Sequence, residues 1–194
     1  MSNRATLIVL FFFILCASCK SQEHIAEKKL KGCIEQKFDN QTYKLDSSLP
    51  LDYYQIMSQM ENHFIAKGIG KNTSKEGYLK IIDEILNSDE ANQKSLYSEL
   101  ILIAKKNNYN GIYFSTDVMQ NCPQYITSKE KEIPPSMAKQ FNAMDKLFAF
   151  DPYDQNYMSE LVNTVDENDF KKLTYRVPII TILFEYLGYI VQGK

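Results

Sequence analysis

Residues 175–191 have the sequence YRVPIITILFEYLGYIV, and the spacing of their polar positions distinguishes a helix from a strand. Its many β-branched and aromatic residues would suit a strand. The few small or polar positions, however, recur at intervals of four, three and four residues: Thr181, Glu185, Gly188 and Gln192. This spacing forms one stripe along a helix and has no meaning at the two-residue period of a strand. We therefore expect a mostly buried helix at the centre of a bundle, with Glu185 on a stripe that faces solvent.

The helical period extends through most of the preceding chain. Apolar residues at spacings of three and four predict further helices at residues 52–66, 73–87, 89–106, 116–122, 136–148 and 151–165. Thr73 and Glu76 form a capping-box signal, and Asp89 can cap the next helix. Pro123 is expected to end a helix, and Asp151-Pro152 to begin one. These elements predict an all-α fold, a single irregular bundle of about six to seven helices.

The N-terminal segment has the features of an export signal. Arg4 is the one charged residue among the first nineteen, and residues 7–18 carry no charge. An uncharged run of this length is too short for a comfortable membrane span, which needs about 20 residues, but it suits the hydrophobic core of a signal peptide. Small residues then lead to a cysteine in the sequence Cys16-Ala17-Ser18-Cys19.

This arrangement resembles the precursors of bacterial lipoproteins, although Cys16 stands where such precursors usually have Leu. The resemblance covers only about the first 20 residues. It implies that residues 1–18 are a signal peptide, that Cys19 becomes the lipid-modified first residue of the mature chain, and that Lys20 permits transfer to the outer membrane. An ordinary signal peptide cut near Ala17 or Ser18, or an uncleaved anchor, are the alternatives.

The remaining chain divides into a tether and one domain. Residues 19–48 are polar and rich in lysine, which predicts a tether that begins disordered and ends by docking. Residues 25–38 within it could form a helix, although Gly32 interrupts them and their apolar stripe is thin. Residues 49–194 are expected to form the helical domain. The 176 residues left after removal of the signal are ample for one core.

Charge and composition argue against a nucleic-acid partner. Without Arg4 the mature chain carries 21 basic and 24 acidic residues, and they are not separated into a basic face. A nucleic-acid footprint needs a clustered excess of Lys and Arg. The chain has 13 Tyr and 11 Phe but no Trp, which slightly disfavours a carbohydrate-stacking platform.

Two cysteines remain as a pair once Cys19 is assigned to lipid and Cys16 to the signal peptide. Cys33 and Cys122 would then lie in an oxidising compartment, where a disulfide is the natural expectation. Two buried thiols are the plain alternative. A catalytic thiol at Cys122, activated by His63 and oriented by Asn62 or Asn121, is a third.

No assembled catalytic or metal-binding set is evident. The chain has two histidines, and His63 is expected on the solvated face of its helix. Residues 151–160 fail the spacing of an EF-hand, and residues 166–169 are better explained as a helix start. Gly68-x-Gly70-Lys71 follows a helix and lacks the rest of a phosphate loop. A two-carboxylate glycosidase would need a facing pair, which the sequence alone cannot assign among Glu61, Glu84, Glu99 and Glu185.

The sequence therefore predicts a lipid-anchored protein of the bacterial envelope, on the outer membrane, with no catalytic residues, cofactor or metal. Its domain is expected to bind a protein partner without catalysing a reaction. An envelope hydrolase is one alternative. The other is a carrier with a large apolar cavity lined by Met57, Met60, Phe141 and Phe184.

Overall fold

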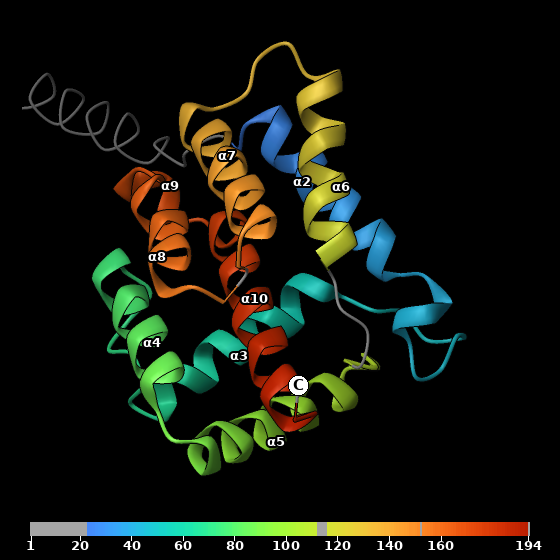
Figure 1. The fold of residues 1–194 in the computed structure, drawn as a ribbon. Helices are drawn as coiled ribbons and strands as arrows, with labels where there is room; N and C mark the ends of the chain where they lie inside the picture. The colour runs from blue at the N-terminus through green and yellow to red at the C-terminus, as the bar shows by residue number, and fades with distance from the viewer. Residues whose placement is uncertain (1–22, 112–115, 152, 194) are drawn as a thin grey trace, which may run out of the picture.

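The computed structural model describes residues 23–111, 116–151 and 153–193, and within these ranges the protein is helical, with no strand (Figure 1). The predicted signal peptide and Cys19 lie outside the described residues. The α-helices are α2 (Ile25–Phe38), α3 (Tyr53–Ala66), α4 (Lys75–Asn87), α5 (Glu90–Lys106), α6 (Thr116–Lys129), α7 (Pro135–Ala149), α8 (Gln155–Asn163), α9 (Glu167–Phe170) and α10 (Leu173–Val191). The all-α bundle predicted from the sequence is confirmed. Two further helices lie outside the predicted count of six to seven: α2, which the sequence offered only as a possible helix in the tether, and the short α9, which follows the helix start expected at residues 166–169.

The C-terminal helix α10 is the axis of the bundle. In Figure 1 it runs through the middle of the molecule, and it packs against α2, α3, α5, α8 and α9. Every residue from Thr174 to Glu185 is buried. Among the described helices, none combines the length and apolar character that a membrane span requires.

The expectation that the stripe on α10 faces solvent is wrong over most of its length. Thr181 is fully buried and its hydroxyl lies 2.8 Å from the Tyr53 hydroxyl, while Glu185 is only 9% exposed. Only Gln192, at the end of the stripe, is exposed. Because helices surround α10, its small and polar positions face other helices, and hydrogen bonds rather than water satisfy the Thr181 hydroxyl.

Residues 25–38, assigned to the tether in the sequence analysis, form a packed helix. One stripe of α2 is completely buried, at a spacing of four residues: Ala26, Leu30, Ile34 and Phe38. The ring of Phe38 stacks on Tyr53 of α3, with the two planes 2° from parallel. Gly32 does not interrupt the helix, because packing of this stripe supplies the stability that local propensity lacks.

One asparagine holds the segment between α2 and α3 against the turn that follows α5. Asn108, in the turn after α5, has φ of +64° and presents its side chain to residues 46–49. Its amide nitrogen donates to the carbonyl oxygens of Asp46 and Leu49, and its amide oxygen accepts from the backbone of Asp46. A β-bridge between Lys44 and Tyr109 lies next to these bonds.

The prediction that Pro123 ends a helix is wrong. Helix α6 continues through Pro123 to Lys129, and its buried positions keep the helical spacing on both sides of the proline: Val118, Met119, Cys122 and Ile126. Packing of this stripe against α2 and α7 offsets the backbone hydrogen bond that proline cannot make. The loop between α6 and α7 is therefore confined to residues 130–134.

Helix caps follow the sequence signals to within a few residues. Asp52 and Asp89 cap α3 and α5 with their side chains. For α4 the cap is Ser74, whose hydroxyl accepts from the Gly77 amide, and not Thr73. For α8 the cap is Asp154 and not Asp151, which instead accepts from the Tyr153 amide in the preceding turn. Neighbouring residues with similar hydrogen-bonding side chains can each serve as the N-cap, so the sequence signal locates the cap only to within a few residues.

Gly32 gives a test of how α2 is stabilised. A β-carbon at Gly32 would meet no atom within 4 Å. Since glycine inside a helix costs stability relative to alanine, Gly32→Ala should raise the free energy of unfolding by about 0.5–1 kcal/mol, measured by urea denaturation. Gly77→Ala is the control, because its β-carbon would lie 2.2 Å from the Asn72 carbonyl oxygen and should destabilise the protein. Loss of stability in Gly32→Ala would contradict the packing of α2.

Candidate functional site

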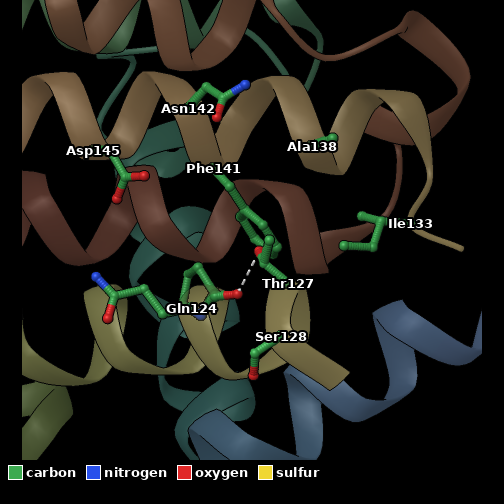
Figure 2. A pocket seen from close by; sticks show the side chains of 9 residues that line it. Gln124, Thr127, Ser128, Ile133, Ala138, Phe141, Asn142 and Asp145 are labelled. Carbon is green, nitrogen blue, oxygen red and sulfur yellow. Dashed lines mark hydrogen bonds between the residues drawn. The ribbon is translucent and has the colours of Figure 1, made fainter. Parts of the chain in front are cut away.

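A groove of about 330 Å³ lies between α6 and α7 and is a candidate binding site (Figure 2). Its lining residues come from α6 (Pro123, Gln124, Thr127 and Ser128), from the loop (Ile133) and from α7 (Ala138, Phe141, Asn142 and Asp145). In Figure 2 the side chains of Phe141 and Thr127 point toward each other across the groove. The groove therefore has an apolar floor with hydrogen-bonding side chains along both walls.

The local sequence explains this arrangement. On α7, Ala138, Phe141 and Asp145 recur at intervals of three and four residues and so share one face. A second face of α7, which includes Met137, Met144 and Leu147, is fully buried. On α6 the Thr127 hydroxyl donates to the Pro123 carbonyl oxygen at 2.9 Å.

The lining residues limit the chemistry that the groove can support. Asp145 is the one ionisable side chain among its lining residues. General acid–base catalysis needs a positioned proton donor or acceptor, usually supported by a second group. The lining offers amides, hydroxyls and an apolar floor, which can hold a peptide or another neutral polar ligand.

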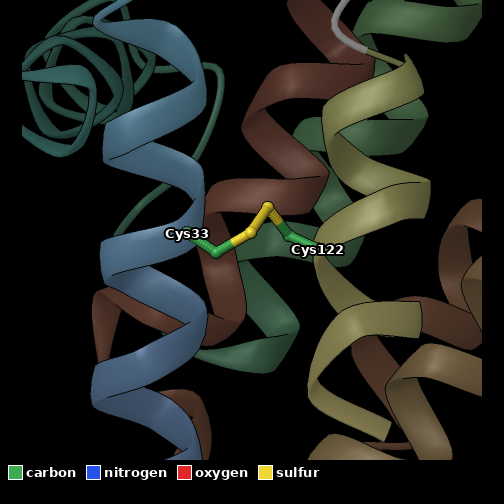
Figure 3. Close-up of a disulfide and its surroundings, with 2 residues drawn as sticks. All are labelled: Cys33 and Cys122. Carbon is green, nitrogen blue, oxygen red and sulfur yellow. A yellow bond between two sulfur atoms is a disulfide. The ribbon is translucent and has the colours of Figure 1, made fainter. Parts of the chain in front are cut away.

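Cys33 of α2 and Cys122 of α6, predicted as a pair, form a disulfide (Figure 3). Their Cα atoms are 5.8 Å apart, and 89 residues separate them in sequence. In the chain-entropy view, closing a loop of this length contributes about 4–5 kcal/mol to stability. The Cys122 side chain is fully buried and its sulfur is bonded to Cys33, so it offers no free thiol.

His63 lies on a different part of the surface and has partners that the sequence analysis did not foresee. Its Nε2 is 2.6 Å from Glu99 of α5, and Lys67 lies 2.7 Å from the other oxygen of the same carboxylate. Hydrogen bonds from Lys67 and then from His63 lower the pKa of Glu99. His63 is partly exposed, as expected, and it also makes a hydrogen bond to Glu99 that joins α3 to α5.

A buried ion pair joins α3 to the central helix. Arg176 of α10 donates from Nε and Nη2 to the two carboxylate oxygens of Glu61, at 2.6 and 3.2 Å. Its Nη1 donates to the Phe170 carbonyl oxygen of α9, and the Tyr78 hydroxyl of α4 donates to Glu61. Burial opposes the charge on Arg176, but the hydrogen bonds and charge of Glu61 outweigh it and raise the pKa of Arg176. Burial, followed by the charge of Glu61, also raises the pKa of Tyr78, so its hydroxyl remains a donor.

A second buried carboxylate joins α2 to the start of α10. Glu27 is 1% exposed and accepts from Lys172 at 2.7 Å and from the Tyr175 hydroxyl at 2.8 Å. Lys172 also donates to Asp169 at 2.9 Å. These groups satisfy one another, and none of them lines the α6–α7 groove. They hold helices together, and no sequence motif pointed to Glu27 or Arg176.

The other candidate residues are dispersed. The carboxylates considered for glycoside hydrolysis are engaged separately, because Glu61 pairs with Arg176, Glu99 with His63, and Glu84 lies 3.9 Å from Lys80. The described residues contain no group of three or more His, Cys, Asp or Glu side chains that could hold a metal ion. The predicted lining of an apolar cavity is core instead: Met57, Met60 and Phe184 are buried, and only Phe141 reaches the groove.

No protein-family model matches the chain, and neither a curated protein nor a solved structure is significantly similar to it. The candidate site therefore rests on the geometry and chemistry of this chain.

The Glu61–Arg176 pair can be tested by breaking it in two ways. Arg176→Met leaves the Glu61 carboxylate buried without its cation, and this should lower the free energy of unfolding by about 3–5 kcal/mol. The double variant Glu61→Gln with Arg176→Met removes both charges and should recover much of that loss, since the new amide oxygen could still accept from Tyr78. Urea denaturation measures both. A loss below about 1 kcal/mol in Arg176→Met would show that the pair does not hold α10 in place.

Proposed function

We propose that this protein is a lipid-anchored component of the bacterial envelope whose helical domain binds a protein partner in the α6–α7 groove and catalyses no reaction. The observation that carries the proposal is the groove itself, with an apolar floor, neutral hydrogen-bonding walls and a single carboxylate. Peptide-binding grooves combine these features: apolar contact supplies affinity, and a few polar groups fix the orientation of the peptide.

The proposed anchor is Cys19. Its sequence context resembles the cleavage site of lipoprotein precursors, and Lys20 favours the outer membrane. Each buried CH₂ of an acyl chain contributes about 0.8 kcal/mol, and two or more chains hold a protein stably at a membrane. An anchor at Cys19 would place the described part of the chain, whose first residue is Glu23, close to the lipid surface.

The lining residues of the groove indicate which kind of peptide segment it would bind. An apolar side chain would lie over Phe141, Ala138 and Ile133, while the side chains of Gln124 and Asn142 would bond to the peptide backbone. Asp145 favours a neutral or weakly basic segment, because an acidic one would be repelled. A volume of about 330 Å³ accommodates one or two side chains and a short piece of backbone.

The two alternatives have less support. A Cys–His hydrolase would need the Cys122 thiol, which is bonded to Cys33. A carrier of apolar molecules would need space around Met57 and Met60, both of which have no exposed surface and belong to the packed core.

The anchor is tested by metabolic labelling with a clickable fatty acid. Wild-type protein should incorporate the label, and Cys19→Ala should not, because the thioether and the new amino terminus both depend on that residue. Cys16→Ala is the control and should be labelled like the wild type. Equal labelling of wild type and Cys19→Ala, or no labelling of either, would end the lipoprotein proposal.

The groove is tested by site-specific photo-crosslinking in intact cells. A crosslinking amino acid at Gln124 should capture an envelope protein. One at Lys80 should not, because Lys80 is an exposed residue of α4, a helix that Figure 1 shows apart from α6 and α7. Ala138→Arg, which fills the groove, should reduce the capture by about tenfold or more.

Ala149→Arg is the matched control, since Ala149 is exposed at the end of the same helix and lies outside the groove. It should leave the capture unchanged. Capture that survives Ala138→Arg, or that is equally strong at Lys80, would contradict binding in the groove.

A further inference from the structure

A second groove, of about 640 Å³, lies between α2 and α6. Its α2 wall is formed by Lys29, Gly32, Cys33, Gln36 and Lys37, which lie three or four residues apart and so share one face of the helix. Its α6 wall is formed by Asn121 and Tyr125, one helical turn apart. None of these residues lines the groove between α6 and α7, so the two sites are separate.

The two walls of the α2–α6 groove are fixed relative to each other. Cys33 and Cys122 join the helices by the disulfide that Figure 3 shows. The Lys29 ammonium lies 2.6 Å from the Glu130 carboxylate, so the two helices run antiparallel and are tied at a second point. A groove whose walls are already held in place loses little conformational freedom when a ligand binds.

Gly32 leaves open space in the α2 wall. A β-carbon at this position would meet no atom within 4 Å, and Gly32 is not among the glycines with positive φ. Neither packing nor backbone conformation therefore requires glycine here, although glycine inside a helix costs stability. Because Gly32 lines the groove, a longer side chain would extend into it. The space that a ligand needs accounts for a residue that the fold does not need.

The accessible side chains of the groove suit a ligand with both an apolar face and many hydroxyls. Tyr125 is 52% exposed and offers the face of its ring for contact. Gln36 and Asn121 are exposed as well, and each side-chain amide carries hydrogen-bond donors and an acceptor. A pyranose ring presents C–H groups on one face and hydroxyls around its edge, which matches this combination.

Lys37 adds a positive charge that the protein does not neutralise. The carboxylates nearest to it in sequence, Glu35 and Asp39, pair with Lys31 and Lys44 instead. Within the described residues, the Lys37 ammonium has no ion-pair partner. The lining of the groove contains no carboxylate, so an anionic group near Lys37 would meet attraction without repulsion from the groove itself.

A peptide matches this groove less well than a sugar does. Peptide grooves bind apolar side chains in apolar pockets, as Phe141 and Ile133 would allow in the α6–α7 groove. The lining of the α2–α6 groove contains no aliphatic side chain. We propose that this groove binds a saccharide that carries an acidic group, with a sugar ring over Tyr125 and the acidic group at Lys37. Its volume suits about two sugar rings.

The test compares cellobiose with cellobiouronic acid, which differs from it only in a carboxylate that replaces one hydroxymethyl group. Each is titrated into the full-length chain, and the dissociation constant is taken from NMR shifts of backbone amides. Wild-type protein should bind both and should prefer the acidic sugar about two- to fivefold, as expected for an exposed ion pair. Lys37→Gln should remove the preference and leave the binding of cellobiose unchanged. Lys28→Gln is the matched control, since Lys28 is exposed on the same helix outside the groove, and it should keep the preference.

Two further variants test the floor and the aromatic face. Gly32→Gln should weaken the binding of both sugars about tenfold or more by filling the groove, yet it should unfold at the same urea concentration as wild type or at a higher one. Tyr125→Ala should weaken both about threefold or more. Ala138→Arg, which blocks the α6–α7 groove, should leave both dissociation constants unchanged, so failure of one proposed site does not decide the other.

Several results would overturn the saccharide site. They are the absence of saturable binding of either sugar to wild type, equal affinity of wild type for the two sugars, and wild-type affinity in Gly32→Gln or Tyr125→Ala. A lower urea midpoint in Gly32→Gln would show that this glycine serves the fold. Tetraglutamate that binds as tightly as cellobiouronic acid would assign the groove to an acidic peptide instead.

Discussion

Arg176 places a permanent positive charge inside the most apolar of the described helices, and α10 can be buried only if that charge is neutralised. A buried guanidinium without a counter-charge would cost several kcal/mol. Glu61 of α3 accepts two of its hydrogen bonds, and the Phe170 carbonyl oxygen of α9 accepts another. Tyr78 of α4 donates to the same carboxylate. The single charge of Arg176 therefore fixes α10 against three other elements.

A second buried carboxylate, Glu27, fixes the N-terminal end of α10 in a similar way. Glu27, on a helix that is distant in sequence, is buried and accepts from Lys172 and Tyr175 at the start of α10. Apolar packing alone would let α2 shift along the bundle at little cost, whereas a buried carboxylate is stable only where its donors lie. The Cys33–Cys122 bond then joins α2 to α6. Through these links α6 and its groove are held in a defined position relative to the central helix.

The two candidate binding regions differ in chemistry. The groove between α6 and α7 is open and carries a single carboxylate, with Phe141 at its floor and amides around it. The groove between α2 and α6 carries an exposed tyrosine, amides and ammonium groups, and its lining has no carboxylate. On the proposals made above, the α6–α7 groove would hold a protein partner and the α2–α6 groove an acidic saccharide. The ion pairs around α10 would keep both in one rigid body.

The helical fold, the central position of α10 and the Cys33–Cys122 pair were all predictable from the sequence, although two buried thiols remained an alternative to the disulfide. Periodicity is a local property, so it correctly showed which residues of 175–191 share a face, and Asp52 and Asp89 marked helix starts through short-range hydrogen bonds. Only the tertiary structure decided what covers each face. Glu185 is buried because helices surround α10, and α6 continues through Pro123 because its apolar stripe is packed on both sides of the proline. The Arg176 pair and the two grooves beside α6 arise from contacts between distant segments, which no local pattern encodes.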